Sequence, residues 1–298
     1  MLLPENDSLL LTARKVTRAF FLVRGLARIA EVVRRYYARH SSKTILVDDY
    51  HGNLKFYCEL HKYITSQIFW RGHSSDGQLI LVDRALKADS VFFDVGANIG
   101  EFTLTAASKL NAGTVYAFEP SGVMMKKLQA NIAVNAFSNI KTFNFGFSDT
   151  SKTLPIYSCP NIGFDGTLND GALTLYRTDN VCELLEQVKL EVFDTFVETN
   201  KIDKMDVLKI DVEGAELSVL KGAARSIERF KPVIMIEVND LACTAAGYDG
   251  REILRFLERI GYRLMSVHEK GRTRPLSSGG KVSALENVIA AHPEGKQI

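Results

Sequence analysis

Acidic side chains at the ends of apolar runs are the residues in this sequence whose types and spacing could do chemistry. The clearest case is 91-VFFDVGANIGEF-102, in which an apolar run reaches Asp94 and is followed by Gly96, Asn98 and Gly100. Glycine has no Cβ, so Gly96 permits a tight turn and a close approach of a ligand to the backbone. The stretch therefore predicts a strand that ends in a ligand-binding turn.

The turn departs from the pattern of dinucleotide-binding proteins. Their fingerprint, G-x-G-x-x-G, has a second glycine where this sequence has Asn98. Asp94, directly before the turn, would also repel a pyrophosphate. An acid here suits a ligand that carries an amine, and S-adenosylmethionine fits, because its methionyl part has both an ammonium and a carboxylate. Asn98 and Glu101 also have the spacing of a capping box, which predicts a helix whose first N–H groups face an anionic group.

Two further acids follow the next two apolar runs. Glu119 lies in 117-AFEP-120 and could accept hydrogen bonds from both hydroxyls of a ribose. Asp149, after the third run, is placed to meet the exocyclic amine of an adenine. Each acid alone could be a helix cap or a turn former. Three acids in this order, together with the glycine turn, favour a binding site for S-adenosylmethionine.

Asp211, Glu213 and Glu237 are the candidate general bases. They lie at the ends of the fourth and fifth runs, 206-DVLKID-211 and 233-VIMIEV-238. Adjacent strand ends would bring these carboxylates together, and clustered like charges raise the pKa of one of them toward neutrality. A base of this kind could take the proton from a hydroxyl during methyl transfer.

Other interpretations of these acids stay open. Clustered carboxylates could hold Mg²⁺ or Ca²⁺, which favour oxygen ligands, although a divalent metal is not the favoured interpretation and no metal ligand is assigned. Glu213 or Glu216 could instead cap a helix that starts near Gly214. His51 and His73 are further candidate bases.

The apolar runs alternate with amphipathic segments, which predicts an α/β fold with a doubly wound, mostly parallel sheet. The first five runs lack strict alternation and suit strands covered on both faces. The last two, 262-YRLMSVH-268 and 286-ENVIAA-291, are joined by the polar loop 269–281, so we expect an antiparallel pair.

Three regions are predicted. Residues 1–43 form a basic amphipathic helical extension, residues 44–87 form a small β-rich segment with a hairpin near its start, and residues 88–298 form the S-adenosylmethionine-binding domain. Within that domain, residues 155–190 are rich in turn formers with little periodicity, and we interpret them as a substrate loop or lid.

Four stretches, 94-DVGANIG-100, 117-AFEP-120, 209-KIDVEGAELSVLKGA-223 and 236-IEVN-239, resemble the FkbM-type family of S-adenosylmethionine-dependent methyltransferases. The resemblance covers about residues 65–291. It implies a class I methyltransferase sheet of seven strands with the last strand antiparallel, and O-methylation of a sugar, glycan or other small-molecule hydroxyl. It also implies roles for two sets of residues. The cofactor positions are Asp94, Gly96, Asn98, Gly100, Glu119 and Asp149, and the acidic positions near the substrate face are Asp211, Glu213, Glu216 and Glu237.

Composition narrows the class of protein. A net charge of +2 over 298 residues gives no support for nucleic-acid binding. The four cysteines are scattered without a CxxC pair, so we expect no disulfide framework and a cytoplasmic location. No apolar run is long enough to span a membrane.

Residues 1–40 carry eight lysines and arginines against three acids, interspersed with apolar residues. Such a helix could lie on an anionic membrane at its inner face, or it could pack on the domain or on a second subunit.

Two rival functions remain. One is an NAD(P)-dependent oxidoreductase, which the missing glycine at Asn98 disfavours. The other is a non-catalytic binding module on a methyltransferase scaffold, which altered acids would have suggested, yet Asp94 and Glu119 are intact.

Overall fold

A computed structural model describes residues 8–22, 26–159, 161–162, 167–169, 173–177, 182–280 and 282–296. The chain divides into two compact units. The smaller comprises residues 1–75, 133–135 and 159–172, and the larger comprises residues 76–132, 136–158 and 173–298. The boundaries of the three predicted regions stay predictions.

The smaller unit combines helices with a β-hairpin. Its helices are α1 (Ser8–Leu22), α2 (Ala27–His40) and α3 (Tyr63–Arg71), and its strands are β1 (Thr44–Tyr50), β2 (Leu54–Glu59), β8 (Asn161–Ile162) and β9 (Leu168–Asn169). β1 and β2 pair antiparallel, which confirms the predicted hairpin. The prediction of a β-rich segment over 44–87 is wrong beyond β2, because helix α3 and the first helix of the larger unit follow. Phe69 and Trp70 of α3 are fully buried.

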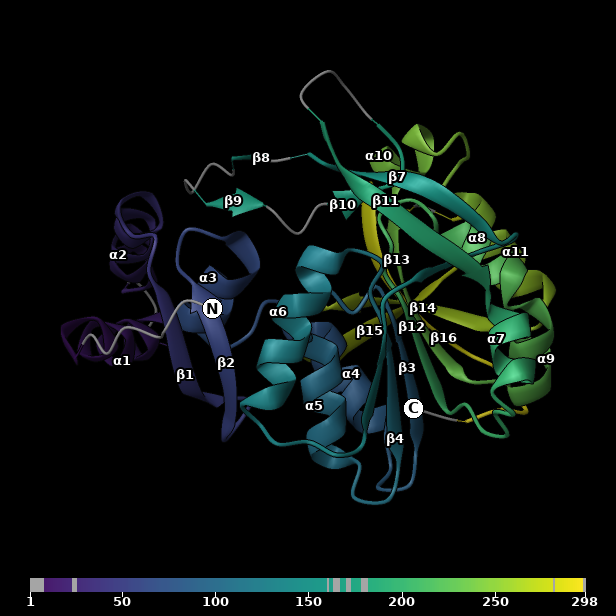
Figure 1. Cartoon of the computed structure of the whole chain (residues 1–298), viewed down its shortest axis with the longest axis horizontal. Coiled ribbons are helices and arrows are strands. Elements are labelled where there is room, and N and C mark those ends of the chain that lie inside the picture. Colours follow the sequence, from purple (N-terminus) through teal and green to yellow (C-terminus); the bar gives the residue numbers. More distant parts are fainter. Residues whose placement is uncertain are drawn as a thin grey trace. The chain divides into compact units, whose positions relative to one another are not determined.

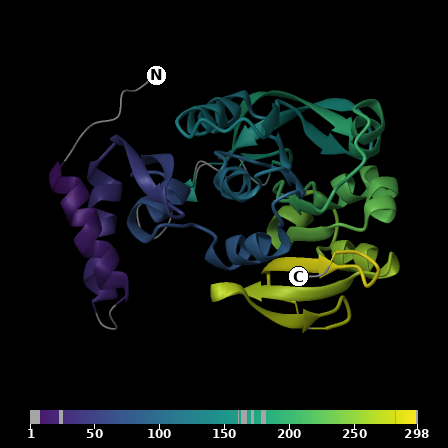
Figure 2. The same ribbon diagram turned by 90° about the horizontal axis from the view of Figure 1, so that it is seen from below.

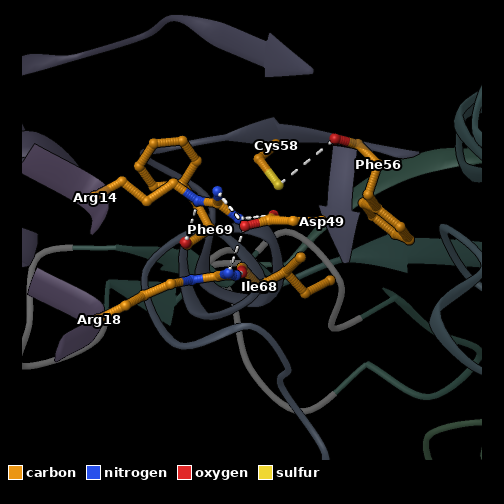
Figure 3. Close-up of polar contacts among 7 residues, drawn as sticks. All are labelled: Arg14, Arg18, Asp49, Phe56, Cys58, Ile68 and Phe69. Atoms are coloured by element: carbon orange, nitrogen blue, oxygen red, sulfur yellow. Dashed lines mark hydrogen bonds and ion pairs between the residues drawn. The ribbon is translucent and has the colours of Figure 1, made fainter. Parts of the chain in front are cut away.

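The arginines of α1 bind within the smaller unit (Figure 3). Arg14 donates from Nε to the carbonyl oxygen of Phe69 at 2.8 Å, and its guanidinium pairs with Asp49. Arg18 donates to Asp49 at 2.9 Å and to the carbonyl oxygen of Ile68 at 3.1 Å. These contacts support the interpretation that α1 is packed on protein, and among the described residues no helix is both long and apolar enough to cross a membrane.

The larger unit is built on one eight-stranded sheet with the order β15-β14-β16-β13-β12-β3-β4-β5. Its strands are β3 (Val91–Val95), β4 (Thr114–Phe118), β5 (Ile140–Phe143), β12 (Val207–Ile210), β13 (Val233–Asn239), β14 (Arg263–His268), β15 (Arg272–Leu276) and β16 (Leu285–Ala291). The five strands from β5 to β13 run parallel. β16 lies antiparallel between β13 and β14, as predicted for the last strand.

One strand of this sheet was not predicted. β15 pairs antiparallel with β14 and adds an eighth strand at the edge, inside the segment expected to be a polar loop. Figure 2 shows the C-terminal strands side by side at one edge of the sheet. β15 is almost wholly exposed and contains a proline, so it lacks the apolar run by which a buried strand is predicted.

Helices cover both faces of the sheet, which confirms the doubly wound α/β fold (Figure 1). They are α4 (Asp76–Ala85), α5 (Glu101–Lys109) and α6 (Gly122–Ala133) on one face, α7 (Phe193–Thr199), α8 (Glu216–Gly222), α9 (Ala224–Phe230) and α11 (Arg251–Arg259) on the other, with α10 (Asp240–Ala245) and the short η1 (Glu269–Gly271) in connections. Neighbouring residues of β3 enter opposite cores, Phe92 beside α4 and α5 and Phe93 beside α7. β3 and β12 pair in parallel at the point where the strand order reverses, so their carboxyl ends lie together.

A second sheet occupies much of the predicted substrate loop. It has the order β10-β7-β11-β6, formed by β10 (Leu173–Thr174), β7 (Lys152–Ser158), β11 (Glu183–Val192) and β6 (Gly146–Ser148). The expectation of a segment without regular structure over 155–190 is therefore wrong at β7 and β11. Residues 160, 163–166, 170–172 and 178–181 of that segment lie outside the described residues.

The cysteines differ from the expectation. Cys58 and Cys243 are buried thiols outside any disulfide, whereas Cys159 and Cys182 are disulfide-bonded. The prediction that the scattered cysteines form no disulfide is therefore wrong. Cys159 directly follows β7 and Cys182 directly precedes β11, and β7 pairs with β11. Spacing in the sequence does not reveal such a strand pairing.

Candidate active site

The glycine turn after β3 is held against two neighbouring strand ends. The N–H groups of Gly96 and Ala97 both donate to the carbonyl oxygen of Phe118, at 3.0 and 2.9 Å. Gly96 has φ +81°, and a Cβ placed on it would lie 1.8 Å from the carbonyl oxygen of Asp211. No larger residue fits there without moving the backbone of one strand end. The turn therefore requires glycine for close packing as well as for its conformation.

Asn98 and Glu119 meet inside this turn. The two carboxylate oxygens of Glu119 accept from the backbone N–H groups of Asn98, at 2.8 Å, and Ser121, at 2.9 Å. Burial raises the pKa of Glu119 to about 7, although both hydrogen bonds oppose the rise. Among the described residues, the side-chain Oδ1 of Asn98 is buried without a hydrogen-bond partner. The predicted capping box is wrong, because α5 starts after Gly100 without a side-chain cap and Asn98 lies in the left-handed region at φ +50°.

Asp94 lies beneath the turn and has no exposed surface. Its Oδ2 accepts from the Thr103 hydroxyl at 2.6 Å, and its Oδ1 lies 3.2 Å from Nζ of Lys209. The sequence predicts a direct contact between this acid and a ligand amine. In the structure its oxygens contact Thr103 and Lys209, and its contact with a ligand stays a prediction.

Asp211, Glu213 and Glu237 form an acidic cluster at the ends of β12 and β13. One carboxylate oxygen from each lies within 4.8 Å of the others, and all three residues are half-buried. Burial, strengthened by the charges of neighbouring acids, raises the pKa of Glu213 to about 8 and that of Glu237 to about 9. The structure thus brings together the three residues predicted as bases, although the roles of these residues stay predictions. Groups of acidic residues are common in proteins without a bound ion, and we assign no metal to this cluster.

Glu216 holds the turn that carries this cluster. Its carboxylate accepts from the N–H groups of Val212 and Gly214, both at 3.0 Å, and from the hydroxyl of Tyr248 at 3.3 Å. These bonds fix the turn around Glu213, whose φ of +52° is unusual for a residue with a side chain. Glu216 therefore holds the turn before α8. The interpretation that Glu213 or Glu216 caps the helix is wrong, because α8 begins without a side-chain cap.

Asp149 lies apart from these contacts. It pairs with Lys152 at 3.3 Å and accepts from the Ser148 hydroxyl at 3.0 Å. A Cβ on Gly222, at the end of α8, would lie 3.5 Å from its Cα. Its role at an adenine stays a prediction, and the neighbours described here give it no support.

The second sheet contacts the segment that follows Glu119 and the turn around Glu213. Glu186 on β11 accepts from the Ser121 hydroxyl at 2.9 Å and from the N–H of Gly122 at 3.0 Å. At the other side, the Thr174 hydroxyl on β10 donates to the carbonyl oxygen of Glu213 at 3.1 Å. Sequence reasoning missed Glu186 and Thr174, because only the strand pairing places them here. A signal did exist for Lys209, a cation inside an apolar strand.

Comparison with known proteins gives one consistent result. A model of the methyltransferase FkbM domain matches residues 94–264, more than half of the chain. Methyltransferase sdnD of Sordaria araneosa is 32% identical over 46% of this chain and 61% of its own length. Hexuronic acid methyltransferase AglP of Haloferax volcanii is 29% identical over 60% of this chain and 65% of its own length. The 31-O-demethyl-FK506 methyltransferase FkbM of Streptomyces tacrolimicus is 30% identical over 66% of this chain and 80% of its own length. The chain thus spans about three fifths of the first of these relatives.

Proposed function

The chain belongs to the FkbM methyltransferase family, and on that basis we propose that it transfers the methyl group of S-adenosylmethionine to a hydroxyl of a sugar, glycan or other small molecule. The observation that carries the proposal is the contact between the glycine turn and the acidic cluster. Gly96 of the turn packs directly on the carbonyl of Asp211 in the cluster. A ligand in the turn and an acceptor at the cluster would therefore be neighbours.

The residues of the turn fit this cofactor. Glu119 is fixed by two backbone N–H groups with its carboxylate at the strand end, where it can accept from ribose hydroxyls. The buried Oδ1 of Asn98 is an acceptor that lacks a donor among the described residues, and an ammonium or hydroxyl of a ligand would satisfy it. The NAD(P)-dependent alternative gains no support, because each of the three relatives is named as a methyltransferase.

When bound, S-adenosylmethionine supplies an activated methyl group. The protein has to place the acceptor oxygen in line with it, and orientation of this kind can contribute about 7–11 kcal/mol to lowering the barrier. The acidic cluster takes the proton of the hydroxyl as the oxygen attacks. The pKa values, raised to about 8 for Glu213 and about 9 for Glu237, make these carboxylates stronger bases, and they become available as bases when the pH rises toward those values.

The charge of the cluster also bears on the acceptor. When the cluster acids lose their protons to act as bases, their charges would repel an anionic group placed at the reacting hydroxyl, so we propose that the hydroxyl belongs to a neutral part of the acceptor. The names of the relatives from Haloferax volcanii and Streptomyces tacrolimicus support a sugar or a complex small molecule. Thr174 and Glu186 place the second sheet beside the site, which supports residues 155–190 as the segment that selects the acceptor.

Transfer of a labelled methyl group to a panel of acceptors tests this function. The panel holds neutral glycosides, the matching uronates, polyketide alcohols and primary amines. We expect label in a neutral hydroxyl compound. Label only in amines would overturn O-methylation. A protein that binds S-adenosylmethionine yet labels no member of a wide panel would favour the non-catalytic binding module.

We also propose, as a separate matter, that α2 touches an anionic membrane. The exposed face of α2 carries Ile29, Val32 and Tyr36, with exposed arginines such as Arg28 and Arg39 next to them. The disulfide-bonded cysteines weigh against a reducing compartment. Sedimentation with phosphatidylglycerol vesicles should carry the protein down, and Val32→Glu should reduce this. Recovery of all protein in the supernatant would remove the proposal.

A further inference from the structure

Lys209 is a cation inside a buried strand. It lies on β12 with only 3% of its surface exposed, at a position where a strand covered on both faces normally carries an apolar residue. Its ammonium lies 5.1 Å from the ring centroid of Phe102. A lysine is almost never buried to this degree unless its charge is paired.

This ammonium makes one hydrogen bond and two ion-pair contacts, each with a different segment. Nζ donates to the carbonyl oxygen of Gly96 at 3.0 Å. It lies 3.2 Å from Oδ1 of Asp94 and 3.6 Å from Oδ2 of Asp211. One contact therefore goes to the glycine turn itself, one to the acid beneath that turn, and one to the acidic cluster.

Neutralising Asp94 would need only one of these contacts. The bond to the Gly96 carbonyl holds the backbone of the turn at the place where a Cβ would strike Asp211. The ion pair with Asp211 holds the side chain of a cluster residue from the opposite side. Glu119, Glu213 and Glu237 also feel this charge, which lowers their pKa values against the effect of burial.

We propose that Lys209 is a positioning residue, which fixes the glycine turn and the acidic cluster relative to each other so that cofactor and acceptor are held in register. This proposal rests on the proposed function, because it gives the turn and the cluster their roles. The rival interpretation is that Lys209 serves only to neutralise the buried charge of Asp94.

A comparison in two backgrounds separates the interpretations. The affinity for S-adenosylhomocysteine is measured by calorimetry for wild type, Lys209→Met, Asp94→Asn and Asp94→Asn/Lys209→Met. If Lys209 acts only through Asp94, the lysine substitution has no further effect once Asp94 is neutral. If it also holds Gly96 and Asp211, we expect the double variant to bind about tenfold more weakly than Asp94→Asn, the loss expected for one charged hydrogen bond.

Lys204→Met in the Asp94→Asn background is the matched control. Lys204 is 40% exposed in its side chain and pairs with Asp89 at 2.8 Å, so its loss should leave the affinity unchanged. Equal affinities of Asp94→Asn and Asp94→Asn/Lys209→Met would overturn the positioning role. If Lys209→Met alone does not fold, the comparison of Asp94→Asn with Asp94→Asn/Lys209→Met still distinguishes the two interpretations. Failure of wild type to bind the ligand would instead contradict the proposed function.

Discussion

Replacing Gly96 by alanine is expected to abolish cofactor binding and to lower the free energy of unfolding by about 3 kcal/mol or more. The added Cβ would lie 1.8 Å from the carbonyl oxygen of Asp211, and the φ of +81° is unfavourable for alanine. Either the turn or the end of β12 must move. Both are needed to bring a bound cofactor next to the acidic cluster.

Gly247→Ala is the matched control for this prediction. Gly247 has φ +86°, yet a Cβ there meets nothing within 4 Å. Its replacement should cost only about 1–2 kcal/mol, the penalty of the left-handed conformation. Urea unfolding and calorimetric titration of S-adenosylhomocysteine measure both effects. Equal losses of stability in the two variants, with ligand binding kept by Gly96→Ala, would contradict the close packing of the turn.

Replacing Glu237 by glutamine is expected to lower kcat, measured at about pH 9 where Glu237 begins to lose its proton, by about 10²–10⁴-fold, the usual contribution of a placed general base. Glu237 is the cluster acid on β13, and Asp211, directly after β12, already pairs with Lys209. The affinity for S-adenosylhomocysteine should not change, because the residues that contact Glu119 and the glycine turn are untouched. The measurement is single-turnover methyl transfer to the acceptor found in the panel.

Glu198→Gln is the control for this substitution, because Glu198 lies on α7 with its side chain 60% exposed. It should leave both kcat and ligand affinity unchanged. A fall in affinity of Glu237→Gln that matches its fall in kcat would show a structural role, and full turnover would remove Glu237 as the base.

The same variant should alter how stability depends on pH. The pKa of Glu237 is raised from an ordinary value of 4.5 to about 9 in the folded protein. Between these values the folded state keeps a proton that the unfolded state has released, so the free energy of unfolding falls as the pH rises. Thermal unfolding of wild type should therefore occur at a lower temperature at pH 9 than at pH 6. Glu237→Gln should show a shallower fall, and an identical slope would contradict the burial of this charge.

The sheet could be predicted because its central strands are buried on both faces. Runs such as 91-VFFDV-95 are apolar for that reason, and their alternation with helices predicts the parallel order. The polar loop 269–281, which joins the last two runs, predicts the antiparallel end of the sheet. The strands that were missed have another character. β11 and β15 are partly or wholly exposed and carry many charged residues, so apolar periodicity does not mark them.

The site could be predicted in part for a related reason. Strand ends that face one edge bring Asp211, Glu213 and Glu237 together, and sequence order is enough to infer this. The hydrogen-bond partners of buried polar groups could not be predicted in this way, because tertiary packing determines them. The contacts of Lys209 with Gly96 and Asp94, and the exchange of a predicted Asn98 cap for a bond to Glu119, depend on segments distant in sequence.

Calorimetric titration of S-adenosylhomocysteine and NAD into wild type and Glu119→Gln tests the central claim most directly. The glutamine keeps the size of the side chain but removes the charge that accepts ribose hydroxyls. We expect micromolar binding of S-adenosylhomocysteine to wild type, loss of this binding in Glu119→Gln, and no binding of NAD to either protein. Folded wild-type protein that binds NAD, or that binds neither ligand, would contradict a methyltransferase site at this turn.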